Sequence, residues 1–123
     1  MTGEIKGLVW VIPDGDLPPP GKGKIKGHES LIIINTGKKK AEITIDIYFE
    51  DRPPVKGIKD VVEAERVRCF RLDKTLGKQK YRIPYGQYGM VVKSSVPVVV
   101  QFGRADVRQP NLAYYCTMAY PIK

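Results

Sequence analysis

The alternation of apolar and polar residues in AEITIDIYFE, residues 41–50, constrains the fold more than any other feature. Ile43, Ile45, Ile47 and Phe49 fall on one face of an extended chain, and Thr, Asp, Tyr and Glu occupy the positions between and after them. A period of two residues is that of a β-strand with one buried face. This segment therefore predicts a strand that covers a hydrophobic core.

Short apolar segments rich in β-branched residues recur along the chain, and Gly, Pro and polar turn residues separate them. Such a pattern is typical of a β-sandwich or β-barrel. We expect an all-β, single-domain fold over residues 1–123, a jelly-roll-like antiparallel β-sandwich of about eight strands. The expected strands are residues 8–12, 31–34, 41–50, 58–63, 67–72, 88–93, 96–100 and 113–120.

Two of these segments, residues 31–34 and 96–100, are apolar at every position. A continuous apolar run indicates a strand that is covered on both faces. We therefore place these two strands either at the centre of the sandwich or at an interface between subunits.

The segments between the strands also carry turn signals. Asn35-Thr36-Gly37 and the three lysines after it form a polar reversal, so we expect a β-hairpin between residues 31–35 and 41–50. Residues 14–26 hold three consecutive prolines and several glycines, which predicts a long, stiffened loop. A second long polar loop is expected at residues 73–84.

The formal net charge of +8 permits an anionic partner such as nucleic acid, but does not require one. Nucleic-acid binding would need the basic residues to form one contiguous surface. The alternative is that they are solvated charges in turns. The candidate nucleic-acid contacts are Lys22, Lys24, Lys26, Lys38, Lys39, Lys40, Arg66 and Arg68.

Several features bear on where the protein works. No segment has the roughly 18–20 consecutive apolar residues that span a bilayer, and the first residues lack the pattern of a signal peptide. We therefore expect a cytoplasmic protein that does not span a membrane. Cys69 and Cys116 lie in apolar strand-like segments, which predicts buried free thiols. Few Asn and Gln beside many Lys, Arg and Glu hint at a thermophile.

The segment SVPVVVQFGRADVRQ, residues 95–109, joins an apolar strand to a charged end. Arg104, Asp106 and Arg108 point the same way if the strand continues through them. Burying charge is costly unless the charge is paired. These residues are therefore either a salt-bridge ladder, within the chain or between subunits, or a site for a polar or anionic partner.

Other residues are candidates for the same site. His28 and Glu29 are strand neighbours that point to opposite faces, and the chain has no further histidine, so we predict no metal site. His28 either caps the glycine-rich loop or lines a pocket. Trp10 is either a core residue or a stacking platform. Arg71 is in register with apolar residues and needs a carboxylate or a bound anion.

The chain lacks the usual patterns of catalytic sites. No general base stands next to a nucleophile, and the sequence has neither a phosphate-binding loop nor a paired-carboxylate motif. We therefore predict that the protein is not an enzyme and needs no cofactor.

An ordered set of residues along nearly the whole chain carries a family resemblance. Its members are Trp10, Gly15 with Pro19-Pro20, His28-Glu29-Ser30, Ile43-Thr44-Ile45 with Tyr48, Arg66, Arg71, the string SVPVVVQ, Arg104-x-Asp106-x-Arg108-Gln109 and Ala119-Tyr120. This set resembles the sensory rhodopsin transducer family, and the last third of the chain is its most specific part.

The resemblance implies a jelly-roll-type β-sandwich that assembles as a homotetramer. In the typical member it implies a soluble transducer that interacts with a membrane photoreceptor. For members without a rhodopsin it implies a small-ligand role, with a carbohydrate-like ligand, and weak DNA binding has also been attached to the family.

We therefore predict a non-enzymatic signalling or ligand-binding module that self-associates and binds a receptor or a small polar or anionic ligand. Its arginines would bind carboxylate, phosphate or sugar hydroxyls, with Asp106 orienting one of them. The alternatives are a DNA-binding regulatory protein and a structural oligomer whose arginines make subunit ion pairs. The residues expected to line one cleft are Trp10, His28, Glu29, Arg104, Asp106 and Arg108, with Arg71 and Gln101 as supporting members.

Overall fold

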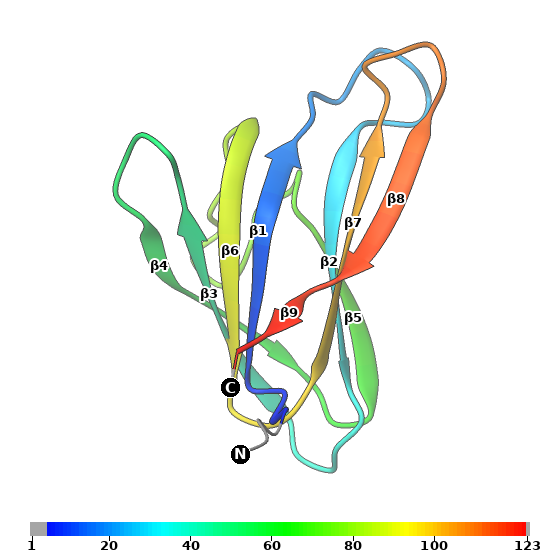
Figure 1. Cartoon of the computed structure of the whole chain (residues 1–123). Helices are drawn as coiled ribbons and strands as arrows, with labels where there is room; N and C mark the ends of the chain where they lie inside the picture. Colours follow the sequence, from blue (N-terminus) through cyan, green and yellow to red (C-terminus); the bar gives the residue numbers. More distant parts are fainter. Residues whose placement is uncertain (1–4, 123) are drawn as a thin grey trace.

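The computed structural model describes residues 5–122, which form two antiparallel β-sheets packed face to face (Figure 1). The strand orders are β4-β3-β6-β1-β9 in the first sheet and β5-β2-β7-β8 in the second. The described residues contain no helix, and so none that could cross a membrane. The strands are β1 (Val9–Leu17), β2 (His28–Asn35), β3 (Ala41–Tyr48), β4 (Val55–Val62), β5 (Arg66–Arg71), β6 (Gly86–Ser94), β7 (Val99–Asp106), β8 (Ala113–Met118) and β9 (Tyr120–Pro121).

The predicted all-β antiparallel sandwich is confirmed, with nine strands where about eight were expected. Most successive strands alternate between the two sheets, as in a jelly-roll-like sandwich. The alternation in β3 works as the sequence indicates, because Ile43, Ile45 and Ile47 are all buried in one core. Fully burying one such side chain contributes about 1.5–3 kcal/mol.

The expected hairpin between β2 and β3 is wrong. β2 pairs with β5 and β7, whereas β3 pairs with β4 and β6 in the other sheet. The polar turn after Asn35 therefore crosses from one sheet to the other. Asn35 itself is fully buried and fixes this crossing: its side chain accepts a hydrogen bond from the Gly37 N–H and donates to the carbonyl oxygens of Lys39, Val62 and Glu63.

The first long loop begins later than expected, because β1 continues through residues 14–17. A β-bulge between Ile12 and Gly15 inserts one extra residue opposite β6, and pairing resumes at Gly15 with Tyr88. A bulge bends a strand and locally changes the direction of its side chains. The bulge therefore carries the end of β1 toward the second sheet, where the candidate site lies.

The last predicted strand, residues 113–120, is divided between the two sheets. β8 belongs to the second sheet, Ala119 is buried at the crossing, and β9 pairs with the start of β1 in the first sheet. In Figure 1 the red segment crosses between the sheets in this way, and β1 and β8 diverge above it. This crossing closes one end of the groove described below.

The face of the β5-β2-β7-β8 sheet that points away from the core, hereafter the outer face, is rich in exposed apolar side chains. Ile34, Val67, Val99 and Tyr114 lie there. The two cysteines lie there as well: both thiols are exposed, so the prediction of buried thiols is wrong. That prediction rested on the apolar segments around the cysteines, but both thiols point to the face of the sheet that the rest of the chain does not cover.

Candidate functional site

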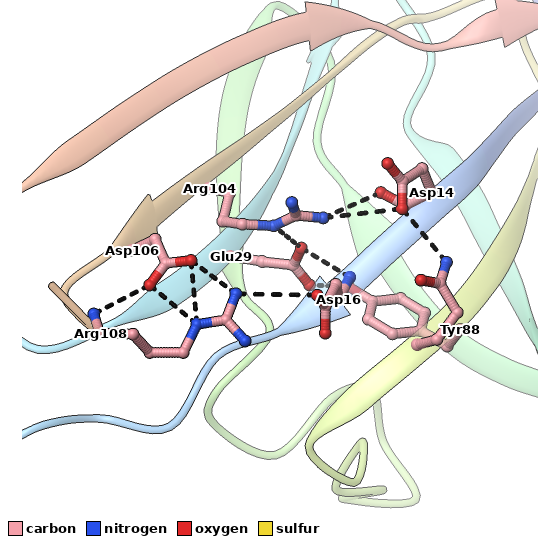
Figure 2. Close-up of polar contacts among 8 residues, drawn as sticks. Asp14, Asp16, Glu29, Tyr88, Arg104, Asp106 and Arg108 are labelled. Carbon is pink, nitrogen blue, oxygen red and sulfur yellow. Dashed lines mark hydrogen bonds and ion pairs between the residues drawn. The ribbon is translucent and has the colours of Figure 1, made fainter.

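A fully buried carboxylate, Glu29, lies at the centre of a polar network where the two sheets meet (Figure 2). The guanidinium Nε of Arg104 donates to its Oε2 atom over 2.7 Å. The hydroxyl of Tyr88 donates to Oε1 over 2.6 Å, and the backbone N–H of Asp16 donates to Oε2 over 2.9 Å. The buried charge is thus paired and hydrogen-bonded on both oxygens, as a charge in a protein interior must be.

The strand registers explain why these groups meet. Glu29 of β2 is the direct cross-strand partner of Arg104 in β7, so both side chains lie on the inner face of the same sheet. Tyr88 reaches Glu29 from the opposite sheet. Its ring passes over Gly15, where a Cβ atom would lie 2.4 Å from the ring. Glycine at position 15 is therefore required for Tyr88 to reach the carboxylate.

A second guanidinium extends the network toward solvent. Arg108 makes a bidentate contact with Asp106, with its Nη2 atom 2.6 Å from Oδ2, and lies 3.7 Å from a carboxylate oxygen of Asp16. Arg104 donates to the backbone carbonyl of Asp14 over 3.2 Å and lies 3.9 Å from its carboxylate. Figure 2 shows Arg104 between Glu29 and Asp14, and Arg108 between Asp106 and Asp16. These contacts are the intrachain form of the predicted salt-bridge ladder.

The network shifts the ionisation of its members. Burial, together with the charge of Glu29 and the hydrogen bond to it, raises the pKa of the Tyr88 phenol far above its ordinary value. Burial would lower the pKa of Arg104, but the hydrogen bond to Glu29 and its charge outweigh burial and raise it. Hydrogen bonds from Arg108 lower the pKa of Asp106. Tyr88 is therefore neutral, and both arginines and Asp106 are charged, over the whole physiological range.

The network carries a net negative charge. It contains four carboxylates and two guanidinium groups, which leaves an excess of two negative charges in a chain whose net charge is +8. Each guanidinium already has a carboxylate within hydrogen-bonding distance. An incoming anion would have to approach guanidinium groups whose charge is already paired, within an excess of negative charge. The arrangement therefore favours hydrogen-bond donors and cations over anions.

A groove of about 410 Å³ opens beside the network, between β1 and β8. This volume lies within the range of about 300–1,000 Å³ that is usual for small-molecule sites. One end of the groove reaches the network, because the guanidinium carbon of Arg104 lies 5.2 Å from the centroid of the Tyr115 ring. The lining includes Ile12, Asp14, Phe102, Tyr115, Thr117 and Tyr120.

The structure brings together half of the residues predicted to line one cleft. Glu29, Arg104, Asp106 and Arg108 form the network just described. Arg104 also lies against the Tyr115 wall of the groove. These four residues and the groove form the candidate site.

The other predicted cleft residues lie elsewhere, which corrects the expectation of a single cleft. His28, Arg71 and Gln101 are on the outer face, the opposite side of the sheet from Arg104. The reason is that side chains alternate between the two faces along a strand. His28 is adjacent to Glu29, Gln101 is three residues from Arg104, and Arg71 pairs with Ser30, so all three point to the opposite face. His28 donates from Nδ1 to the Lys26 carbonyl over 2.8 Å, which is the capping role.

Arg71 and Trp10, which were also predicted to belong to the cleft, have roles in the fold instead. Arg71 makes a bidentate contact with Asp73, with both bonds at 2.9 Å, which supplies the carboxylate that its position requires. Trp10 belongs to the hydrophobic core and is 6% exposed, and its indole N–H has no hydrogen-bond partner among the described residues. Because it faces the core before the bulge in β1, it does not line the groove.

The basic residues proposed for nucleic acid do not form one surface. Lys22, Lys24 and Lys26 lie in the loop between β1 and β2, and Lys38–Lys40 lie in the turn at the other end of β2 (Figure 1). Arg66 and Arg68 are beside that turn, and Arg68 pairs with Asp60. A contiguous basic surface was the requirement of the nucleic-acid alternative, and the geometry contradicts it.

Sequence reasoning missed the partners that come from other strands, namely Asp14, Asp16, Tyr88 and Tyr115. The two aspartates were placed in a loop because the bulge in β1 has no local signature. Tyr88 gave a usable signal: it shares strand phase with Met90 and Val92, and a buried tyrosine hydroxyl needs a partner. Within residues 5–122, no three His, Cys, Asp or Glu side chains are grouped so as to hold a metal ion.

Comparisons with known proteins agree with this architecture. Residues 6–121 match the family described as Anabaena sensory rhodopsin transducer. The crystal structure of Thermotoga maritima 1070 is 34% identical in sequence with a TM-score of 0.83, and the match covers 95% of this chain and 96% of that one. The Anabaena sensory rhodopsin transducer structure is also 34% identical, with a TM-score of 0.71 over 86% and 94% of the two chains. No curated protein sequence gave a significant match.

Proposed function

The chain belongs to the Anabaena sensory rhodopsin transducer family, and from this premise we propose that it is a non-enzymatic signalling module that binds a small polar ligand and assembles as a homotetramer. One of the solved relatives is a transducer of a sensory rhodopsin by its name, so a receptor is a natural partner for this chain too. A cytoplasmic location and a thermophilic source stay predictions from the sequence.

The groove between β1 and β8 is the observation that carries the ligand role. It combines exposed tyrosine rings with hydrogen-bonding groups at one end, the composition that small-molecule sites use to gain both contact area and orientation. The buried ion pair of Glu29 and Arg104 holds that end in one geometry. A site whose polar groups are fixed beforehand loses less conformational entropy when a ligand binds.

A non-enzymatic role is supported by how two of the four acidic groups of the network, Glu29 and Asp106, are used. Glu29 is fully buried and its oxygens are occupied by three donors. Asp106 is bound to Arg108 on both oxygens. A general base must reach a substrate proton, and these carboxylates are engaged in holding arginines instead.

The ligand role can be tested by thermal shift, because a ligand that binds only the folded state raises the melting temperature. The probes are neutral sugars and sugar derivatives screened at millimolar concentration. Tyr115→Ala removes one wall of the groove and is expected to abolish the shift. Tyr48→Ala is the matched control, since Tyr48 is also an exposed strand tyrosine but lies in β3 of the other sheet. Equal shifts in both variants would contradict binding in the groove.

Self-assembly is supported by the outer face. Ile34, Val67 and Val99 are each more than 40% exposed and lie side by side on three neighbouring strands. Exposed apolar patches of this kind mark interaction sites. A second subunit on this face would also explain the continuous apolar runs at residues 31–34 and 96–100, because both faces of β2 and β7 would then be buried.

Assembly can be tested by placing a charge at the centre of the outer face. Ile32→Lys is expected to convert the tetramer to smaller species in light scattering coupled to size exclusion. Val91→Lys is the control, because it adds the same charge to the outward side of the other sheet. Cys69 and Cys116 provide a second readout, since burial of the outer face should slow their reaction with a maleimide. A wild-type monomer with fast-reacting thiols would contradict the proposal.

A further inference from the structure

The groove has a definite electrostatic character. Its lining includes one charged side chain, the carboxylate of Asp14, and neither lysine nor arginine. Asp14 also belongs to the network, whose three other carboxylates and two guanidinium groups add an excess of one negative charge. Most of the cationic residues that give the chain its charge of +8 therefore lie elsewhere, and the groove is an acidic site on a basic protein.

The Asp14 carboxylate has unused capacity to accept hydrogen bonds. Its side chain is 73% exposed, it accepts one bond from the Gln87 amide over 3.1 Å, and Arg104 lies 3.9 Å away, beyond hydrogen-bonding distance. An ionised carboxylate can accept about four hydrogen bonds. At least half of this capacity is thus open to a ligand in the groove.

The aromatic lining favours the same class of ligand. Tyr115 and Tyr120 are 43% and 70% exposed, and Phe102 forms part of the lining beneath them. The faces of aromatic rings attract cations. Tyr115 already has one cation near its ring, the guanidinium of Arg104, which is only 13% exposed. Arg104 is neutralised by Glu29, so a second cation is not repelled by an unpaired charge.

Resting on the proposed ligand role of the groove, we propose that its ligand is a small organic cation, a protonated or quaternary amine. The ammonium group contacts the Asp14 carboxylate, and the body of the ligand packs on the rings of Tyr115 and Tyr120. The arginines of the network do not bind this ligand, because they position the acidic groups beside it. The arginines in the sequence suggest an anionic ligand, whereas this assignment gives the ligand a positive charge.

Two matched series of probes test the charge of the ligand. Glucosamine, glucose and glucuronate share a sugar ring and carry positive, zero and negative charge, and benzylammonium, benzyl alcohol and benzoate do the same on an apolar ring. Each is titrated into the full chain, and the backbone amide signals of Asp14 and Tyr115 are followed by NMR. We expect the cation of at least one series to bind about tenfold more tightly than its neutral and anionic counterparts.

Variants locate the effect. Asp14→Asn is expected to weaken binding of the cation roughly fivefold and to leave the neutral probe unchanged. Asp51→Asn is the matched control, because Asp51 is also an exposed aspartate but lies between β3 and β4 and pairs with Arg52. Tyr115→Phe should retain cation binding, whereas Tyr115→Ala should lose it.

The outcomes separate this inference from the proposed function. If a neutral or anionic probe shifts the groove signals as strongly as the cation, the cationic ligand is wrong and the groove remains a ligand site. If no probe of either series shifts these signals, the groove itself fails as a ligand site. If the cation binds equally well to wild type and Asp14→Asn, the assignment of Asp14 is overturned.

Discussion

Strand β2 carries two fully buried polar side chains, Glu29 near one end and Asn35 at the other, and the two are held in opposite ways. Asn35 bonds only to backbone groups, the carbonyl oxygens of three residues and the N–H of Gly37. Glu29 bonds mainly to side chains, which come from strands of both sheets. The inner face of β2 thus ends at Asn35 in a turn that is held by bonds to the backbone, here called the backbone corner. At Glu29 it ends in the ion-pair network.

The difference corresponds to how the sandwich is closed at each end. At Asn35 the chain itself passes between the sheets, and the amide fixes that turn. At Glu29 the sheets are joined by charged and phenolic side chains, and a groove opens between β1 and β8. A backbone corner serves the fold alone, whereas a side-chain network beside a groove can also serve a ligand. Substitutions at the two ends should therefore differ in what they change.

The largest effect is expected for Glu29→Ala. It removes the carboxylate and leaves the guanidinium of Arg104, which is only 13% exposed, without its closest partner. Breaking a buried pair by removing one member costs about 3–5 kcal/mol. The free energy of unfolding, measured by urea denaturation, should fall by that amount, and ligand affinity in the groove should fall with it.

A second variant separates charge from hydrogen bonding at this end. Glu29→Gln keeps an oxygen that can accept from Tyr88 or Asp16, but it removes the charge that pairs with Arg104. It should therefore lose less stability than the alanine variant. If the two substitutions cost the same, the charge of Glu29 would be its only contribution and the hydrogen bonds would be dispensable.

Asn35→Ala should have the next largest effect, and on stability alone. It leaves the carbonyl oxygens of Lys39, Val62 and Glu63 without the amide donor. An unsatisfied buried group costs about 1–3 kcal/mol. Urea denaturation gives the loss, and a titration of the groove gives ligand affinity for the remaining folded protein. An altered affinity would show that the two ends are coupled and would remove the distinction between them.

The sequence supports this comparison only in part. The alternation in β3 predicts which residues face the core, and the adjacency of His28 and Glu29 predicts that they face opposite ways. It does not predict which of them is inside, because β2 is apolar on both faces from Leu31 to Ile34 and so has no polar side to define its phase. When both faces of a strand are apolar, the sequence pattern does not show which face packs on the core and which is exposed.

Contacts between strands were predicted less well than the strands themselves. The turn after Asn35 has the composition of a hairpin, yet β2 and β3 belong to different sheets, because tertiary pairing with β5, β7, β4 and β6 outweighs a local turn preference. The same limit hid Asp16 and Tyr88 from the candidate site. Both reach Glu29 across the sandwich, and no spacing in the sequence encodes that approach.

Gly15→Ala tests whether the network depends on the close approach of Tyr88. The new Cβ would lie 2.4 Å from the Tyr88 ring, so the ring must move away from Glu29. Overpacking of this kind costs about 1–3 kcal/mol. Gly89→Ala is the control, since a Cβ there has ordinary contacts of 3.5 Å or more. Equal stability of the two variants in urea denaturation would mean that Tyr88 can reach Glu29 by another path.

The smallest effect at neutral pH is expected for Tyr88→Phe, which removes one hydrogen bond to Glu29 at a cost of about 1 kcal/mol. Its pH dependence is more informative. Burial and Glu29 raise the pKa of Tyr88 in the folded protein, whereas in the unfolded chain the phenol ionises near its ordinary value of 10.0. Above that pH the unfolded state loses its proton first, so stability present at lower pH is lost as the pH rises.

Urea denaturation between pH 8 and 11 measures this loss. Tyr88→Phe should have a shallower decline than wild type, because its ring has no proton to lose, whereas the exposed Tyr85→Phe should keep the wild-type decline. The Asn35 variant should also keep it, since an amide does not titrate in this range. An identical alkaline decline in wild type and Tyr88→Phe would place Tyr88 outside the network, and the Glu29 end would then resemble the Asn35 end in responding to packing and hydrogen bonds alone.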